Sequence, residues 1–243
     1  MSNSCEIGAR SRTGGRPGRR RGPASIAAAA GRGNRGRAAA LLVLALAAAP
    51  AASASPGADA RSLVGTAKAL EFSVSSSKGE EGILLRARYE TAARAGLDAT
   101  IATLWDFAGS PEVFSRIDSV RVLADDGREA VTEQTTGIRV LGLTYLSVAR
   151  FRCRLERISA REARVSFEAI WSDGSVLSTF GSWELREEPS AEGPLTRIVY
   201  SLESRSAATV VGQELIMRSF GGADIARTVK ELAKAVEARA RAR

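Results

Sequence analysis

Apolar and polar residues alternate one by one over much of residues 83–204. In residues 83–91, for example, Ile83, Leu85 and Tyr89 fall on one side and Arg86 and Arg88 on the other. A period of two residues is typical of a β-strand with one buried and one solvated face. Seven segments show this pattern, at residues 83–91, 117–125, 129–140, 143–158, 163–171, 176–186 and 195–204. Their hairpin-like spacing predicts one antiparallel sheet rather than parallel strands alternating with helices.

Two short helical turns are expected between the first two of these strands. Residues 101–107 form a brief apolar segment, with Asp98 in front of it as the expected N-cap. Gly109-Ser110-Pro111 ends that segment, and Pro111 suits the first position of a second short helix.

The chain closes with a long helical segment. Its apolar residues recur at spacings of four, three and four, at Ile225, Val229, Leu232 and Val236. This is the period of an amphipathic helix over residues 224–238, and residues 210–220 also fit a helix. Gly221 and Gly222 lie between the two halves, where we expect a hinge.

The order of these elements, together with a few local sequences, resembles the START-like (helix-grip) superfamily. The matching sequences are Leu104-Trp105-Asp106, Ser110-Pro111-Glu112, Gly181 and Trp183 on the sixth strand, and Leu195-Thr196-Arg197. The resemblance covers residues 83–238 and is greatest for the polyketide cyclase/dehydrase and coenzyme-Q-binding branch. It implies an α+β fold in which a curved, seven-stranded antiparallel sheet wraps around a long C-terminal helix, with two short helices after the first strand. It also implies an aromatic, isoprenoid or lipid ligand between sheet and helix.

The strong positive charge of the chain belongs to its N-terminal segment. Nine of the 35 lysine and arginine residues lie in residues 1–40, beside one acidic residue, Glu6, so 26 basic and 26 acidic residues remain in the rest of the chain. Domains that bind nucleic acid carry a basic surface of their own. The balanced charge beyond residue 40 therefore argues against nucleic acid as a partner.

Residues 1–54 are typical of a leader for export. An arginine-rich segment precedes twelve apolar residues, 38–49, after which Pro50 breaks the run and Ala52-Ser53-Ala54 supplies small residues for cleavage. A positive segment, a short apolar core and an A-x-A site are the signature of a secretory signal peptide. We therefore expect an exported protein, with a linker over residues 55–80 and a ligand-binding domain over residues 81–243.

The same segment fits two alternatives. The uncharged stretch extends from residue 38 to residue 58, which is compatible with an uncleaved membrane anchor, since a spanning helix needs about 20 apolar residues. Mitochondrial transit peptides are also arginine-rich and acid-poor. However, eight glycines before residue 40 disfavour the amphipathic helix that such peptides form.

The chain lacks the side chains that many enzymes use for proton transfer or metal binding. It contains no histidine, and Cys153, which is expected to be a small buried hydrophobe, is the one cysteine outside the predicted leader. Histidine is the usual general base near neutral pH and a common metal ligand. Charged residues of the strands are expected on their solvated side, among them Glu133, Glu168, Glu184, Arg150, Arg152 and Arg154. The sequence therefore assigns no catalytic residue, no metal site and no cofactor.

Aromatic residues are better candidates for a binding site. One lies on the apolar side of each of five predicted strands, and two further apolar residues lie in the helical segment that precedes the glycine pair. The predicted ligand-cavity residues are Tyr89, Phe151, Phe167, Trp183, Tyr200, Leu215 and Phe220. Large apolar residues usually just fill a core, and that is the alternative here. The resemblance favours a cavity, in which buried tyrosine hydroxyls can orient a ligand.

These observations predict an exported, non-catalytic binding protein for a hydrophobic small molecule such as a lipid, a quinone or a polyketide. The alternative is an enzyme of the cyclase or dehydratase type, acting on an aromatic or polyketide ligand in the same cavity. The basic C-terminal end, with Arg239, Arg241 and Arg243, is expected to be solvated. Transient contact of this end with a membrane surface is the alternative.

The leader generates the first prediction. Cleavage after Ala54 should give a mature chain that begins at Ser55, because the A-x-A site directly follows the apolar core. N-terminal sequencing of the protein from the producing cell measures this. Recovery of the full-length chain in the membrane fraction would instead support the uncleaved anchor.

Overall fold

A computed structural model describes residues 59–76, 82–140, 143–174, 176–207 and 212–242, which all belong to one compact unit. The predicted leader and its cleavage site lie outside the described residues. In chain order the elements are η1 (Ala60–Leu63), β1 (Lys68–Ser75), β2 (Ile83–Ala93), α1 (Leu97–Trp105), α2 (Ser110–Val113), β3 (Ile117–Asp125), β4 (Glu129–Val140), β5 (Leu143–Ser159), β6 (Glu162–Ser172), β7 (Val176–Glu188), β8 (Leu195–Ser206) and α3 (Gln213–Arg241).

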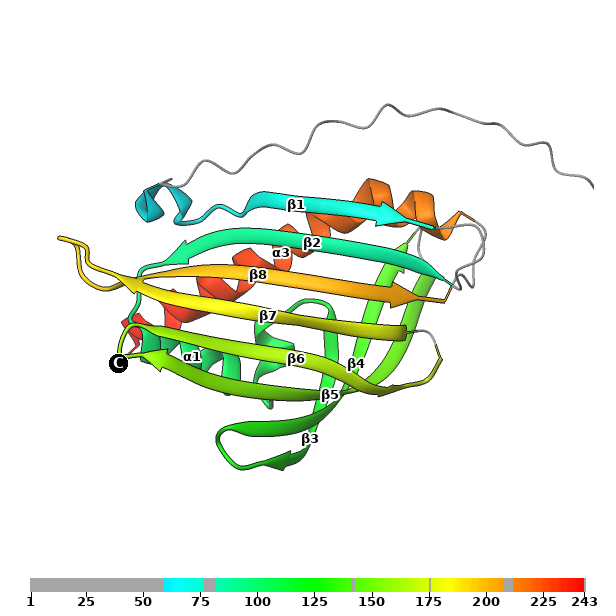
Figure 1. Ribbon diagram of the computed structural model, residues 1–243, viewed down its shortest axis with the longest axis horizontal. Coiled ribbons are helices and arrows are strands. Elements are labelled where there is room, and N and C mark those ends of the chain that lie inside the picture. The colour runs from blue at the N-terminus through cyan, green and yellow to red at the C-terminus, as the bar shows by residue number, and fades with distance from the viewer. Residues whose placement is uncertain (1–58, 77–81, 141–142, 175, 208–211, 243) are drawn as a thin grey trace, which may run out of the picture. The chain divides into compact units, whose positions relative to one another are not determined.

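The strands form one antiparallel sheet in the order β1-β2-β8-β7-β6-β5-β4-β3. Strands β3 to β8 follow one another as neighbours, and β2 crosses over to pair with β8 along its whole length. Figure 1 shows α3 crossing one face of the sheet, with α1 on the same side. The predicted α+β architecture, its closing helix and the two short helices are therefore confirmed.

The sheet has eight strands, so the predicted count of seven is wrong. The additional strand is β1, which lies within residues 55–80, the segment predicted to be a linker. It pairs with β2 from Lys68↔Glu90 to Ser75↔Leu84. The 3-10 helix η1 precedes it and packs Leu63 against Ala92 and Leu195. The folded part of the chain therefore begins before residue 81.

The two faces of the sheet differ in what covers them. Tyr89 of β2 donates a hydrogen bond to the carbonyl oxygen of Gly222 in α3, with 3.0 Å between the two atoms. Tyr89 and the residues paired with it in register therefore lie on the face toward α3, and their chain neighbours point to the opposite face, here called the outer face. Because side chains alternate along each strand, this one contact orients the whole sheet.

The C-terminal half of α3 closes its face of the sheet. The residues of its apolar stripe are buried, namely Ile225, Val229, Leu232, Ala233 and Val236. They pack against α1 and the sheet in the main core cluster. In the preceding part of the helix, from Gln213 to Asp224, every residue is half-buried or exposed. The buried side chains of α3 therefore all belong to its C-terminal part, from Ile225 onward.

The start of α1 is capped by a distant residue. The sequence suggested Asp98 as the N-cap, but that position is occupied by Gly96, and Asp98 lies within the first turn, where it pairs with Arg157. The carboxylate of Glu187, from β7, accepts a hydrogen bond from the backbone N–H of Leu97 at 2.7 Å. A negative charge at a helix N-terminus is favourable, so β7 itself holds α1 in place.

Gly181 allows β6, β7 and β8 to pack closely. A Cβ atom at this position would overlap the carbonyl oxygen of Ser201 and would lie 2.5 Å from Cζ of Phe167. The ring of Phe167 therefore occupies the space that a side chain at position 181 would need. This explains why a strand interior contains glycine, which usually weakens a strand.

Replacing Gly181 by alanine tests this contact. Gly181→Ala should lower the free energy of unfolding by about 1–3 kcal/mol, as overpacking in a core usually does. Gly137→Ala is the matched control on β4, because a Cβ atom there would come no nearer than 3.3 Å to a neighbouring atom, the carboxylate of Asp118. Urea unfolding of both variants measures the difference, and equal effects would show that Gly181 is not required for packing.

Candidate functional site

Aromatic side chains from four neighbouring strands, β5 to β8, meet under α3. The ring centroids of Trp183 and Tyr200 are 4.2 Å apart, and Phe167 stacks on Tyr200 with 6.0 Å between the ring centroids. Phe151 meets Phe167 edge to face at 6.4 Å, and Phe114, which follows α2, lies 6.4 Å from Trp183. Four of the predicted cavity residues are thus brought together in one aromatic cluster. Phe114 was not predicted, because it lies between two of the alternating segments and outside both.

Tyr89 lies at the side of this cluster nearest to α3. It is buried, pairs with Tyr200 in register, and bonds to Gly222 as described above. Burial raises the pKa of its hydroxyl, so the group stays protonated and acts as a hydrogen-bond donor. Its hydroxyl is committed to the helix backbone and not directed at a ligand.

Tyr200 differs from Tyr89 in its hydrogen bonding. Its hydroxyl makes no hydrogen bond to any residue in the described part of the chain. Burial raises the pKa of this hydroxyl strongly, while the positive charge of Arg116 opposes the shift. Arg116, just before β3, forms an ion pair with Asp224 of α3. A phenol with free hydrogen-bonding capacity thus lies near a fixed ion pair beneath the helix.

The aromatic cluster is only partly covered. Tyr89, Trp183 and Tyr200 are buried, whereas Phe151, Phe167 and Leu202 are half-buried on the same face of the sheet. Phe167 and Leu202 pack at the edge of the main core cluster, and Phe151 packs against a smaller cluster with Phe107 and Cys153. Apolar surface therefore stays accessible on the helix-facing side.

Two predicted cavity residues are misplaced. Leu215 and Phe220 of α3 are 69% and 66% exposed, so neither lines the interior. The buried stripe of α3, continued toward its N-terminus by one turn from Ile225, falls on Gly221 and Gly222 and leaves Phe220 to one side. Both residues are apolar, but the period of the helix places them outside the buried stripe.

Gly221 and Gly222 bring α3 close to β1 and β2. A Cβ atom at Gly221 would lie 3.3 Å from the ring of Phe72, and one at Gly222 would lie 3.1 Å from the hydroxyl of Tyr89. The helix α3 runs through both residues without interruption, so the two predicted halves form one helix. A hinge at this pair stays a prediction, and the observed role of the glycines is close packing.

Cys153 is an unreactive part of the core. It is buried beside Phe107 and Ala130, and burial raises the pKa of its thiol to about 12. A thiol with such a pKa is protonated at neutral pH and is a poor nucleophile. Among the described residues, no group of three or more cysteine, aspartate or glutamate side chains is placed to hold a metal ion.

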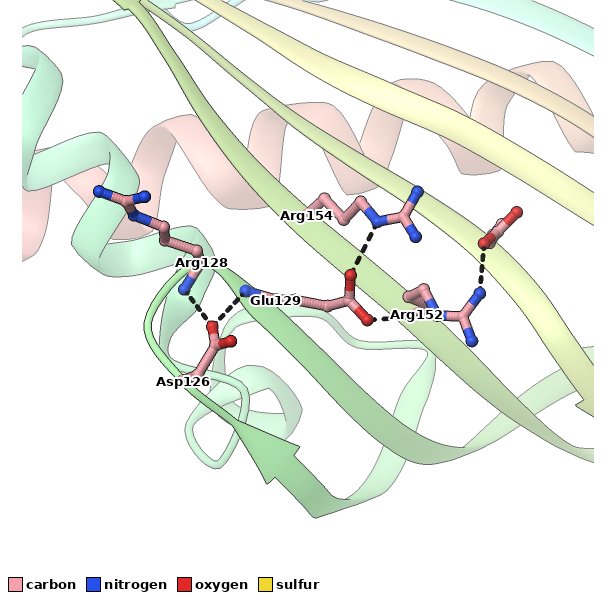
Figure 2. A network of polar contacts seen from close by, with 6 residues as sticks. Asp126, Arg128, Glu129, Arg152 and Arg154 are labelled. Atoms are coloured by element: carbon pink, nitrogen blue, oxygen red, sulfur yellow. Dashed lines mark hydrogen bonds and ion pairs between the residues drawn. The ribbon is translucent and has the colours of Figure 1, made fainter.

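The outer face carries a lattice of arginine and glutamate. Figure 2 shows one part of it, in which Glu129 bridges Arg152 and Arg154, at 3.4 and 2.9 Å. In the same view Asp126 accepts hydrogen bonds from the backbone N–H groups of Arg128 and Glu129, and these bonds lower its pKa. The predicted solvated side of the strands is therefore confirmed, but its arginines do not form an unpaired basic row.

A hollow of about 490 Å³ opens within this lattice. Its walls and floor come from β1, β2, β5, β6, β7 and β8, and include Arg88, Arg154, Ser166, Ser182, Ser201 and Phe180. It lies on the outer face, on the opposite side of the sheet from the aromatic cluster. No pattern in the sequence indicates this hollow, because its residues come together only through the pairing of distant strands.

Solved structures with similar folds were found, although no family model and no curated protein sequence matches the chain. The STAR-related lipid transfer protein of Xanthomonas axonopodis has a TM-score of 0.53 at 14% identity, covering 68% of this chain and 98% of that one. The Zhui aromatase/cyclase of Streptomyces sp. R1128 has a TM-score of 0.51 at 14% identity, covering 64% and 95%. A protein of Thermus thermophilus has a TM-score of 0.50 at 18% identity, covering 65% and 97%.

The chain has the START-like helix-grip fold. The predicted resemblance is thereby confirmed at the level of the fold, with one strand more than expected. No helix among the described residues is long and apolar enough to cross a membrane.

The two buried tyrosines give a matched test of the site. Tyr89→Phe should lower the free energy of unfolding by about 0.5–1.5 kcal/mol, because it removes a hydrogen bond to α3. Tyr200→Phe should change the free energy of unfolding little, because it removes a hydroxyl that has no hydrogen-bond partner among the described residues. Urea unfolding measures both changes, and an equal loss in the two variants would show that the Tyr200 hydroxyl is bonded in the folded protein.

Proposed function

We propose that the protein binds an apolar small molecule between α3 and the sheet. The observation that carries this proposal is the half-buried aromatic surface of Phe151 and Phe167, next to the buried pair Trp183 and Tyr200. Apolar surface left accessible on the inner face of a fold is a favourable place for an apolar ligand. A lipid, a quinone or a polyketide would suit such a surface.

The fold neighbours support the same class of ligand. One is named a lipid transfer protein and another an aromatase/cyclase, and both cover about two thirds of this chain. Apolar ligands of these kinds have a long or planar hydrophobic body with few polar atoms. The flat rings of the aromatic cluster can pack against the hydrophobic part of such a ligand.

Tyr200 is the residue that we propose for orienting the ligand. Its hydroxyl is free to donate a hydrogen bond to a carbonyl or hydroxyl oxygen, and the nearby charge of Arg116 would favour an oxygen atom there. Because its pKa is raised, Tyr200 stays neutral and would serve as a donor rather than as a base.

We propose a non-catalytic role on these grounds. A cyclase or dehydratase needs groups that accept and return protons near neutral pH. The described polar side chains near the aromatic cluster are those of Tyr89 and Tyr200, the ion pair of Arg116 and Asp224, and Thr132 and Gln134, which are hydrogen-bonded to each other beside Phe151. The enzymatic alternative rests on that same set, with Tyr200 as proton donor and Arg116 as the group that polarises a carbonyl. Export of the protein, and transient contact of its basic C-terminus with a membrane, are further proposals supported by the sequence.

The proposed function is tested by filling the interior. Ala169 is half-buried and pairs with Phe151 in register, so a tryptophan at this position would occupy the proposed ligand space. Ala169→Trp should weaken the binding of Nile red, an apolar fluorescent probe, by about tenfold or more, which corresponds to about 1.4 kcal/mol. Fluorescence titration of the purified protein measures the affinity, and native mass spectrometry identifies any ligand that copurifies.

The control places the same side chain on the outer face of the same strand. Arg164 is exposed and pairs with Glu184, a surface ion pair whose loss costs little, so Arg164→Trp should leave probe binding unchanged. The proposal fails if the unmodified protein does not bind the probe, or if Ala169→Trp binds it as tightly as the control.

A further inference from the structure

A row of seven polar residues crosses the outer face of the sheet. Strand pairing places Arg88 opposite Ser201, Ser201 opposite Ser182, Ser182 opposite Ser166, and Ser166 opposite Arg154. The row ends in a glutamate on each side, Glu71 beside Arg88 and Glu129 beside Arg154. Its order is therefore Glu71, Arg88, Ser201, Ser182, Ser166, Arg154 and Glu129.

The three central serines make the hollow. Each is short, whereas the adjacent row on the same face consists of long side chains, in the order Arg86, Glu203, Phe180, Glu168 and Arg152. The serines form the floor and the long residues form the walls, and together they line the hollow of about 490 Å³. That volume lies within the range of small-molecule sites, about 300–1,000 Å³.

The serine hydroxyls face this space unpaired. Ser166, Ser182 and Ser201 are half-buried, and none of their hydroxyls forms a hydrogen bond to a residue that the structure describes. Each hydroxyl can donate one hydrogen bond and accept two. In the same row, the residues on either side of the three serines are arginine and glutamate, so the serines separate two groups of charged side chains.

The charges around the hollow are balanced. Its arginines contact glutamates, at 2.8 Å for Arg86 with Glu203, 3.1 Å for Arg152 with Glu168, 2.9 Å for Arg154 with Glu129 and 3.8 Å for Arg88 with Glu184. A polyanion bound here would meet the glutamates, and a cation would meet the arginines. The paired guanidinium and carboxylate groups present both donors and acceptors, which suits a neutral ligand rich in hydroxyl groups.

The shape of the hollow also suits an elongated ligand that carries hydroxyl groups. Four strand spacings of about 4.8 Å separate Arg88 from Arg154, which gives a trough about 19 Å long. Phe180 projects from its wall and is 51% exposed, so its ring can pack against an apolar face of a ligand. A sugar ring combines hydroxyl groups at its edge with C–H groups on its faces.

We propose that this trough binds a neutral oligosaccharide. The serines and the paired charged residues bond the hydroxyl groups, and Phe180 packs against a ring face. This second site is on the opposite side of the sheet from the aromatic cluster, and it does not depend on the ligand proposed there.

Isothermal titration calorimetry with three neutral tetrasaccharides, maltotetraose, cellotetraose and chitotetraose, tests the proposal. At least one should bind the unmodified protein, and Ser182→Arg should weaken that binding by about tenfold or more, because an arginine fills the trough. Ser119→Arg is the matched control, since Ser119 is an exposed strand residue on β3 outside the hollow. The control should bind as the unmodified protein does.

A second variant, Phe180→Ser, keeps the test informative if Ser182→Arg does not fold. Phe180→Ser removes an exposed ring and should also weaken tetrasaccharide binding, while the binding of Nile red stays unchanged in both variants. The proposal is overturned if none of the three sugars binds, if Phe180→Ser binds them unchanged, or if citrate binds in the trough and is lost with Ser182→Arg. Nile red binding by Ala169→Trp reports on the interior site. Its loss in that variant does not change the outcome of the tetrasaccharide test.

Discussion

The docking of one amphipathic helix on one face of a wide sheet determines most other features of this protein. Four side chains of α3, Ile225, Val229, Leu232 and Val236, are at most 5% exposed. Burying a residue of this kind contributes roughly 1.5–3 kcal/mol relative to leaving it exposed, so the stripe fixes the helix firmly. It also decides which residues of each strand are apolar. On the opposite face, none of the helices that the structure describes covers the sheet, and paired arginine and glutamate side chains face the solvent.

Much of this fold could be predicted from the sequence, because the alternation that builds it is local. The strands β3 and β4 have the predicted bounds, and the other expected strands differ by a few residues at their ends. The exception is β1. Leu70, Phe72 and Val74 alternate as clearly as residues in the other strands, but only three such residues stand next to a serine-rich stretch. Its pairing with β2 is what makes this short pattern a strand.

The candidate site was less accessible to prediction. The strand aromatics could be assigned to the inner face, because residues two apart share a side. Leu215 and Phe220 were predicted to line the cavity because they are apolar. Their positions around the helix axis lie outside the buried stripe, and both are exposed. The approach of Arg116 to Tyr200, and the row of serines, depend on how distant strands and loops come together. β2 pairs with β8 across more than a hundred residues, and a shift by one residue would reverse every side chain.

Gly181 links the two faces of the sheet. On the side toward α3, the absence of its Cβ atom makes room for the ring of Phe167, which carries the aromatic cluster. On the outer side, its neighbours Phe180 and Ser182 supply the wall and the floor of the trough. Both surfaces therefore depend on the same short stretch of β7, although they have opposite chemistry. Because side chains alternate along a strand, each surface can still be changed independently, by substituting only the residues that point to it.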